Sequence, residues 1–350
     1  MPCASSGTGH HRDFAWLEKC PESPCSCLSY ALDRRRMSGT CSPPLTGDPG
    51  MSEFNRRELL LKGMGAAAAA AAASYGLRGA AGTLSDSAHA ATTPTWNHDP
   101  GSLTGPSRWA GIDPGFSACG TGVHQSPINI ETARVSVSRG PALQLKYDES
   151  ELAIGNTGHV IEVRIPSGVE DVLQIGGDSY RLTQYHFHAP SEHTINGRHA
   201  DVEGHFVHTN AAGATAVVGV LYRIGPRPNR LLETILRMAP ETSGTEGRPI
   251  GEANPVDLFR GLDGAYAKRG KVQVDTFYSY DGSLTTPSCT ENVHWYMPHG
   301  SGHVSRAAVT RFHSVVAKFA NYGGYANDNR PVQPLNGRVV QLRVGPKRRS

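Results

Sequence analysis

"LTQYHFHAPSEHTINGRHADVEGHFVHTN" (182–210) contains two strand-like runs joined by a long connection, and it is the starting point for predicting the fold of this chain. Side chains alternate between the two faces of a strand, so residues two apart share a face. Two such sets contain histidine: Gln184, His186 and His188 in the first run, and Glu203, His205 and the apolar Val207 in the second. If the two strands pair, three imidazoles converge.

Three neutral nitrogen donors with a fourth position left open are typical of a catalytic zinc site, whereas a structural site uses four ligands, usually with cysteine. The pair His186 and His188 alone fits ordinary surface or core histidines equally well. The addition of His205 favours a metal, since ligating histidines need acceptors behind them. Gln184 and Glu203 are placed to supply those acceptors.

Short strand-like runs dominate the rest of the chain, and turn signals such as Asn196-Gly197 and Asp281-Gly282 divide them. Helical periodicity is confined to Asn229–Met238 and to Ser305–Phe319, which Ser305 is expected to cap. The expected strands are 142–147, 159–165, 171–175, 180–188, 202–208, 216–224, 275–280, 292–297 and 338–344. This pattern predicts a mainly β (α+β) single domain with a large, twisted, predominantly antiparallel sheet and a few peripheral helices.

The N-terminal part has a different composition. From Met51 the chain reads "MSEFNRRELLLKGMGAAAAAAAASYGLRGA", in which Arg56 and Arg57 precede an alanine-rich stretch. This pattern favours a twin-arginine export signal over 51–90 rather than an alanine-rich core helix, and the stretch is too short and too weakly apolar for a membrane span. We therefore expect a domain over 91–350 that is periplasmic or secreted, and a doubtful or disordered extension over 1–50.

Five of the seven cysteines precede residue 90, which leaves Cys119 and Cys289 in the expected domain. Two cysteines in an exported domain indicate one disulfide, and two buried thiols are the alternative. The formal net charge is only +3, and no basic run is interleaved with aromatic residues. The sequence therefore predicts no nucleic-acid partner.

The chain resembles the alpha-class carbonic anhydrases, in particular exported bacterial members, over nearly all of the expected domain. The stretches that carry the resemblance are "TWNHDP" (95–100), "HQSPINI" (124–130), "GNTGHVIEV" (155–163), "QYHFHAPSEHT" (184–194), "EGHFVH" (203–208), "DGSLTTPSCTENVHW" (281–295) and "NRPVQPLNGR" (329–338). The resemblance implies that zinc-bound hydroxide converts CO2 reversibly to bicarbonate and a proton, with Zn²⁺ held by His186, His188 and His205. It also supports the pairing of Cys119 with Cys289.

Further roles are implied by the resemblance, and among the residues concerned only Val207 has support of its own, since it shares a strand face with His205. Thr285 would orient the hydroxide while its own hydroxyl donates to Glu192, and His159 would carry the proton away. The pocket would be lined by a second polar residue and an apolar wall: Thr286, then Val207, Val217, Leu284, Val293 and Trp295.

Two further histidines are expected to be structural, and two positions differ from the family pattern. His193 is expected to be a buried, hydrogen-bonded neighbour of Glu192, and His208 is expected to point away from the metal ligands. The chain departs from the family pattern at His98, where tyrosine is usual, and at Asp328, where asparagine is common.

Two other functions fit parts of the pattern. The same hydroxide could hydrolyse small esters, or the domain could bind a partner without catalysis, as in carbonic-anhydrase-related proteins. Those proteins characteristically lack zinc histidines, and all three are present here. We expect a monomer or a homodimer.

Overall fold

A computed structural model describes residues 94–268 and 270–345 of the chain. The predicted extension over 1–50 and the predicted signal over 51–90 lie outside the described residues. Within the described part, no helix is long and apolar enough to cross a membrane.

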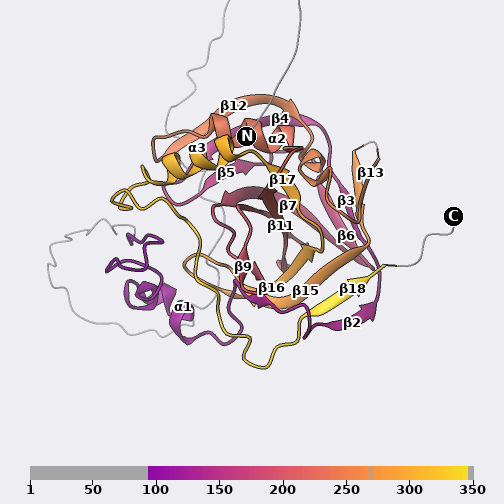
Figure 1. Ribbon diagram of the computed structural model, residues 1–350, viewed down its shortest axis with the longest axis horizontal. Coiled ribbons are helices and arrows are strands. Elements are labelled where there is room, and N and C mark those ends of the chain that lie inside the picture. The colour runs from indigo at the N-terminus through magenta and orange to yellow at the C-terminus, as the bar shows by residue number, and fades with distance from the viewer. Residues whose placement is uncertain (1–93, 269, 346–350) are drawn as a thin grey trace, which may run out of the picture. The chain divides into compact units, whose positions relative to one another are not determined.

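A large curled sheet organises the described residues (Figure 1). In spatial order its main path consists of β13 (Ala265–Lys268), β14 (Lys271–Val274), β3 (Leu143–Lys146), β6 (Val172–Ile175), β7 (Asp178–His188), β10 (Val202–Thr209), β11 (Thr215–Ile224), β16 (Glu291–Pro298), β15 (Thr276–Ser283), β18 (Gln341–Val344) and β2 (Ser136–Arg139). Four strands branch from this path: β5 (Ile161–Arg164) beside β7, β4 (Ser150–Asn156) beside β5, β12 (Thr245–Ala253) beside β4, and β17 (Gly302–Val304) beside β11.

Smaller elements surround the sheet. A small sheet consists of β1 (Asn129–Ile130), β8 (Thr194–Ile195) and β9 (Arg198–His199). The helices are η1 (Trp109–Gly111), η2 (Pro114–Phe116), α1 (Ala118–Thr121), α2 (Arg230–Met238), η3 (Pro255–Phe259) and α3 (Arg306–Val316). The predicted sheet-dominated fold with few helices is confirmed. Most strand pairs are antiparallel, although β11 runs parallel to both β16 and β17.

The two strands predicted from the opening stretch pair as expected. β7 and β10 are antiparallel, with His186 opposite His205 and His188 opposite Glu203. A shift of register between Val207 and His208 interrupts the ladder beyond this point. Because directly opposite residues share a face, the pairing brings the predicted ligands to one face of the sheet.

Helices α2 and α3, both predicted from their apolar periodicity, lie against each other at one edge of the view in Figure 1. Asn229 and Ser305 cap them, each side chain accepting a hydrogen bond from a backbone N–H of the first turn. Helix α3 ends at Val316, three residues before the predicted end at Phe319. Apolar side chains of both helices join the main core on one face of the sheet, including Leu232, Ile235, Phe312 and Val315.

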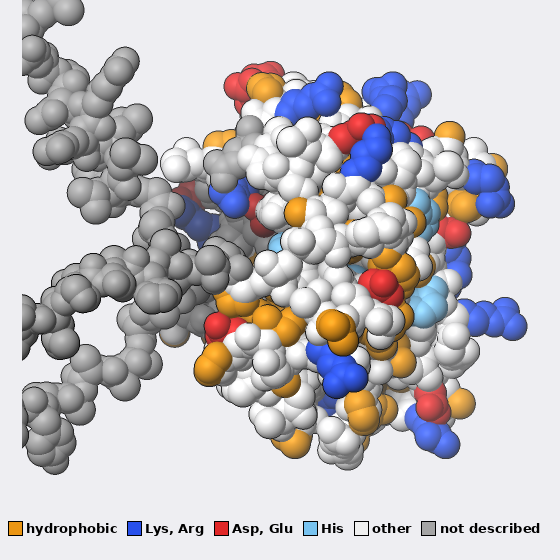
Figure 2. All heavy atoms as spheres, turned by 90° about the vertical axis from the view of Figure 1, so that its left-hand side faces the viewer, with side chains coloured by type: hydrophobic (Ala, Val, Ile, Leu, Met, Phe, Trp, Pro, Cys, Tyr) orange, Lys and Arg blue, Asp and Glu red, His pale blue; other side chains and the backbone are white. Residues whose placement is uncertain are grey.

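The disulfide between Cys119 and Cys289 is present, with Cα atoms 5.0 Å apart. Cys289 packs with Trp96 and Trp109 in a small apolar cluster beside the main core. The bridge therefore ties the N-terminal segment to the loop that follows β15. On the face shown in Figure 2, acidic and basic side chains are interspersed with apolar ones.

Candidate metal centre

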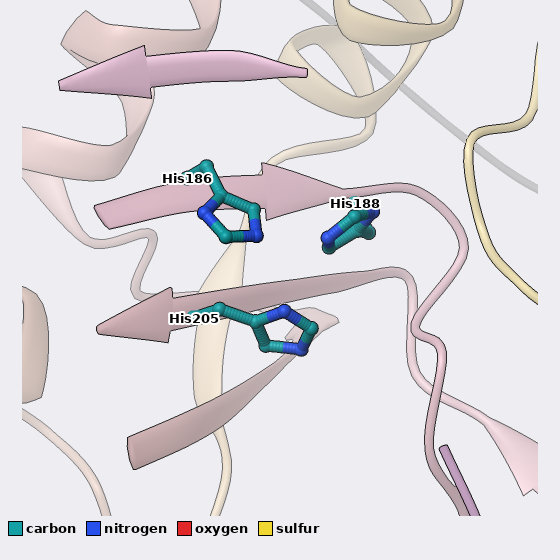
Figure 3. Close-up of side chains that lie close together, drawn as sticks. All are labelled: His186, His188 and His205. Carbon is teal, nitrogen blue, oxygen red and sulfur yellow. The ribbon is translucent and has the colours of Figure 1, made fainter. Parts of the chain in front are cut away.

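His186, His188 and His205 converge between neighbouring strands β7 and β10 (Figure 3). One nitrogen of each ring lies within 4.8 Å of the corresponding nitrogens of the others. His188 and His205 are buried, and His186 is partly buried. Three imidazole nitrogens from two paired strands are thus available to a single ion.

The hydrogen bonds behind the rings determine which nitrogens face inward. Three oxygen acceptors each bond one ring nitrogen: Gln184 Oε1 bonds His186 Nδ1 at 2.8 Å, the Asp328 carbonyl bonds His188 Nδ1 at 2.8 Å, and Glu203 Oε1 bonds His205 Nε2 at 2.9 Å. Each of these nitrogens carries the proton and donates, so the lone pair is left on the other nitrogen of the ring. The donor atoms are therefore Nε2 of His186 and His188, and Nδ1 of His205.

Burial shapes the charge of the site. It lowers the pKa of both His186 and His205, which keeps these two rings neutral at neutral pH. Burial also acts to lower the pKa of His188, but the nearby carboxylates of Glu192 and Asp328 outweigh it and raise the value. Neutral imidazole is the form that binds metal ions.

Glu203 links the metal centre to His193. Its Oε1 lies 2.7 Å from His193 Nδ1, and the other nitrogen of that ring lies 2.6 Å from the Tyr280 hydroxyl. Burial acts to raise the pKa of Glu203, but His193 and His205 hold it well below the usual value. His193 is buried and hydrogen-bonded as predicted, and the partners of its ring are Glu203 and Tyr280.

His208 points away from the ligands, as the alternation of side chains predicted. It is buried, and its Nε2 lies 2.6 Å from the Tyr147 hydroxyl in the main core. Burial lowers its pKa to about 3. The second histidine of this strand is thus part of the core.

Glu192 is fully buried next to the ligand rings. Its Oε1 accepts a hydrogen bond of 2.8 Å from the backbone N–H of Arg330. Its Oε2 has no hydrogen-bond partner and lies 3.7 Å from His188 Nε2 and 3.8 Å from His205 Nδ1. Thr285 is buried in the loop after β15, and no hydrogen bond between it and Glu192 occurs in the described structure. The link between these two residues stays a prediction.

Arg330 was not expected from the sequence. Its buried guanidinium donates to Gln125 Oε1 and to the carbonyl oxygens of Ser126 and Cys119. It also lies over the Trp109 ring, 5.5 Å from the centroid. These contacts hold the segment whose backbone N–H bonds Glu192. The only sequence signal was the motif "NRPVQPL", which does not show partners some 200 residues away.

The predicted apolar wall is brought together in one cluster on the ligand side of the sheet. Val217, Val293 and Trp295 are buried in it, and Val207 and Leu284 pack against it partly exposed. The Trp295 ring lies 4.9 Å from the His205 ring, centroid to centroid. Thr286 is partly buried in the adjacent loop, where its carbonyl accepts from Cys289 N–H.

His159 lies in a different environment from the one expected of a group that titrates near neutral pH. Its ring stacks on Trp96, with centroids 3.8 Å apart and planes 6° from parallel. Burial lowers its pKa to about 4. In this position the ring is neutral across the physiological range.

The two departures from the family pattern have different environments. His98 is buried, and its Nδ1 bonds the Tyr322 hydroxyl. Asp328 orients His188 through its backbone carbonyl, while its side chain accepts from Ala189 N–H at 2.8 Å. Burial raises the pKa of the Asp328 carboxyl to about 7. The orienting contact thus uses a backbone atom that asparagine also has.

The fold and the site together indicate a class: this chain is a β-sheet protein with a candidate metal centre on two paired strands. Three imidazoles converge there, each with an oxygen acceptor behind it. The comparison with known families is specific. Residues 104–344 match the family described as eukaryotic-type carbonic anhydrase, and the chain belongs to that family.

Relatives from plants and bacteria are similar in sequence. Alpha carbonic anhydrase 3 of Arabidopsis thaliana is 37% identical over 266 residues, which cover 74% of this chain and 88% of the relative. A carbonic anhydrase of Neisseria gonorrhoeae is 36% identical over 247 residues, which cover 70% and 88%.

Solved structures show the same fold. The alpha-carbonic anhydrase of Thermovibrio ammonificans, solved with the inhibitor sulfanilamide, aligns with a TM-score of 0.61 and 32% identity over 71% of this chain and all of that one. Dioscorin, solved with ascorbate, aligns with a TM-score of 0.62 and 28% identity over 73% of this chain and all of that one. Since dioscorin shares the fold, the site has to carry the functional argument.

Proposed function

We propose that this chain is a zinc-dependent carbonic anhydrase that interconverts CO2 and bicarbonate with release of a proton. One observation carries the proposal: three oxygen acceptors direct Nε2 of His186, Nε2 of His188 and Nδ1 of His205 to one place. Membership of the carbonic anhydrase family supports it.

The donor set fits zinc. Nitrogen ligands suit this ion, and three protein ligands leave one position for a reactant, as in catalytic sites. The unpartnered, buried Nε2 of His188 supports the assignment, because a buried ring nitrogen without a partner is costly. When bound, zinc supplies Lewis acidity that brings the pKa of a water ligand to about 7, a property established for carbonic anhydrases generally.

The chain's own residues would bind and orient the reactants. The apolar cluster around Val207 and Trp295 offers CO2 a water-poor wall. Glu192 Oε1 accepts a hydrogen bond from Arg330 N–H, and Glu192 Oε2 can accept a hydrogen bond from a second donor. In our proposal that donor is the Thr285 hydroxyl, which would fix the direction of its lone pairs, and Thr285 N–H would stabilise the developing oxyanion.

Proton release is assigned to His159 because of its place in the family motif. The stacked ring is a poor proton acceptor, since its pKa is about 4. The assignment therefore requires the ring to leave Trp96 during turnover and to gain solvent, which would raise its pKa.

Export is the second part of the proposal. The twin-arginine pattern in 51–90 and the disulfide of Cys119 with Cys289 both support an oxidising location, periplasmic or secreted, for a domain over 91–350. The partners expected there are CO2 and bicarbonate.

Stopped-flow measurement of CO2 hydration, with ester hydrolysis measured on the same preparation, tests the proposed reaction. We expect CO2 hydration to exceed ester turnover by several orders of magnitude, because the apolar wall suits a small neutral substrate. For the ligand variant His188→Ala, which should lose CO2 hydration, the matched control is His294→Ala, which changes a partly exposed histidine of β16. Ester turnover without CO2 hydration would favour a hydrolase and contradict the proposal.

A further inference from the structure

A charged pair lies on the sheet face that carries the candidate ligands. Glu162 and Arg164 belong to β5, which pairs antiparallel with β7, and they stand opposite His186 and Gln184. Directly opposite residues of an antiparallel pair point to the same face, with Cβ atoms about 4.5–5.5 Å apart. Glu162 is therefore the cross-strand neighbour of a candidate zinc ligand.

The pair is partly shielded from water. The Arg164 Nε lies 2.6 Å from Glu162 Oε1, and only 14% of the Glu162 side chain is exposed, against 67% for Arg164. Both residues also line a hollow of about 430 Å³ with Gly155, Asn156 and Thr157. The Glu162 carboxylate, opposite His186, is thus the more shielded of the two charges, and the Arg164 guanidinium is the more exposed.

This order of charges acts on anions. A unit charge about 8 Å from a bound anion changes its dissociation constant about two- to sixfold at effective dielectric constants of about 40–80. The neutral substrate CO2 is not affected in the same way, whereas bicarbonate and inhibitory anions are. A carboxylate on the ligand face repels them, and the guanidinium, whose charge is screened more strongly because it is more exposed, offsets part of that repulsion.

We propose that the Glu162–Arg164 pair determines the anion affinity of the metal centre, with Glu162 excluding anions and Arg164 moderating the exclusion. The inference rests on the proposed function, since it assumes a metal at His186, His188 and His205. The pair would thus determine specificity toward anions. Because bicarbonate is an anion, the centre would also hold this product less tightly.

Binding of thiocyanate to the Co²⁺-substituted protein tests the pair, with the visible absorption of cobalt as the readout at low ionic strength. Glu162→Gln is expected to tighten thiocyanate binding about threefold, and Arg164→Gln to weaken it about twofold. The double variant Glu162→Gln with Arg164→Gln should return close to the wild-type value. Glu149→Gln, an exposed carboxylate outside the sheet, is the matched control and should not change the affinity.

The opposite signs of the two single variants separate a charge effect from a disturbance of the fold, which would move both in one direction. Equal affinities for Glu162→Gln and the control, or shifts of the same sign in both single variants, would overturn the inference. Because the readout is binding, the result is independent of CO2 hydration. Protein that binds thiocyanate but does not hydrate CO2 would refute the proposed function. The thiocyanate affinities of the variants relative to the wild-type protein would still decide whether the pair acts through its charges.

Discussion

Each of the three candidate ligand imidazoles has one nitrogen fixed by an oxygen acceptor, and the three acceptors are of different kinds. Gln184 and Glu203 use side chains, whereas Asp328 uses its backbone carbonyl. Side-chain alternation along the two strands predicted the first two acceptors. It did not identify the third, because Asp328 lies 140 residues from His188.

His159 gives the residue-scale prediction. Stacking on Trp96 keeps its ring out of water, so Trp96→Ala should raise the pKa of His159 from about 4 toward the usual value near 6.5. NMR titration of the His159 ring protons measures this change. An unchanged pKa in Trp96→Ala would show that other contacts desolvate the ring.

The sign of the linked stability effect follows from the same shift. A histidine with a lowered pKa in the folded state binds fewer protons than it does in the unfolded state between about pH 4 and 6.5. The contribution of His159 to the free energy of unfolding is therefore fully present above about pH 6.5 and is lost as the pH falls toward 4. The wild-type protein should be more sensitive to acid in this range than the Trp96→Ala variant.

At the scale of elements, local signals predicted some parts well. Helices α2 and α3 have caps and apolar periodicity, and the long central strands have clear alternation. Strand β12 was missed because "TEGRPIGEA" contains glycine and proline and shows no alternation. Its pairing with β4, which has two shifts of register, is set by tertiary contacts instead.

Ser305 gives the element-scale prediction. Its hydroxyl accepts from Ala308 N–H at 3.1 Å and donates to Glu233 Oε2 at 2.7 Å, so it both caps α3 and joins it to α2. Ser305→Ala should lower the free energy of unfolding by about 1–2 kcal/mol, measured by urea denaturation. The exposed Ser314 of α3 provides the control variant Ser314→Ala. Equal stabilities of the two variants would contradict the capping role.

At the scale of the whole molecule, the disulfide and Arg330 connect distant segments around the site. Cys119 and Cys289 are 170 residues apart, and Arg330 bonds the carbonyl of Cys119 as well as Gln125. The sequence predicted the disulfide from cysteine number and expected compartment. It could not predict the guanidinium contacts, because they depend on how segments about 200 residues apart in the sequence meet.

The disulfide is expected to contribute to stability. A bridge that closes so long a loop should stabilise the fold by about 2–4 kcal/mol by restraining the unfolded chain. Replacement of both residues, Cys119→Ser with Cys289→Ser, should lower the free energy of unfolding by that amount in denaturant titrations without reductant. Reductant should destabilise the wild-type protein to a similar extent and leave the double variant unchanged. A wild-type protein insensitive to reductant under unfolding conditions would contradict this prediction.

In our proposal one zinc ion at His186, His188 and His205 supports CO2 hydration, and titration of metal-free protein with Zn²⁺ during stopped-flow assays tests this requirement. We predict that activity is absent without metal, rises linearly and levels off at one equivalent. His188→Ala, which removes the buried Nε2 donor, should stay inactive at that stoichiometry. Full activity of the metal-free protein, or of His188→Ala at one equivalent of zinc, would contradict the account.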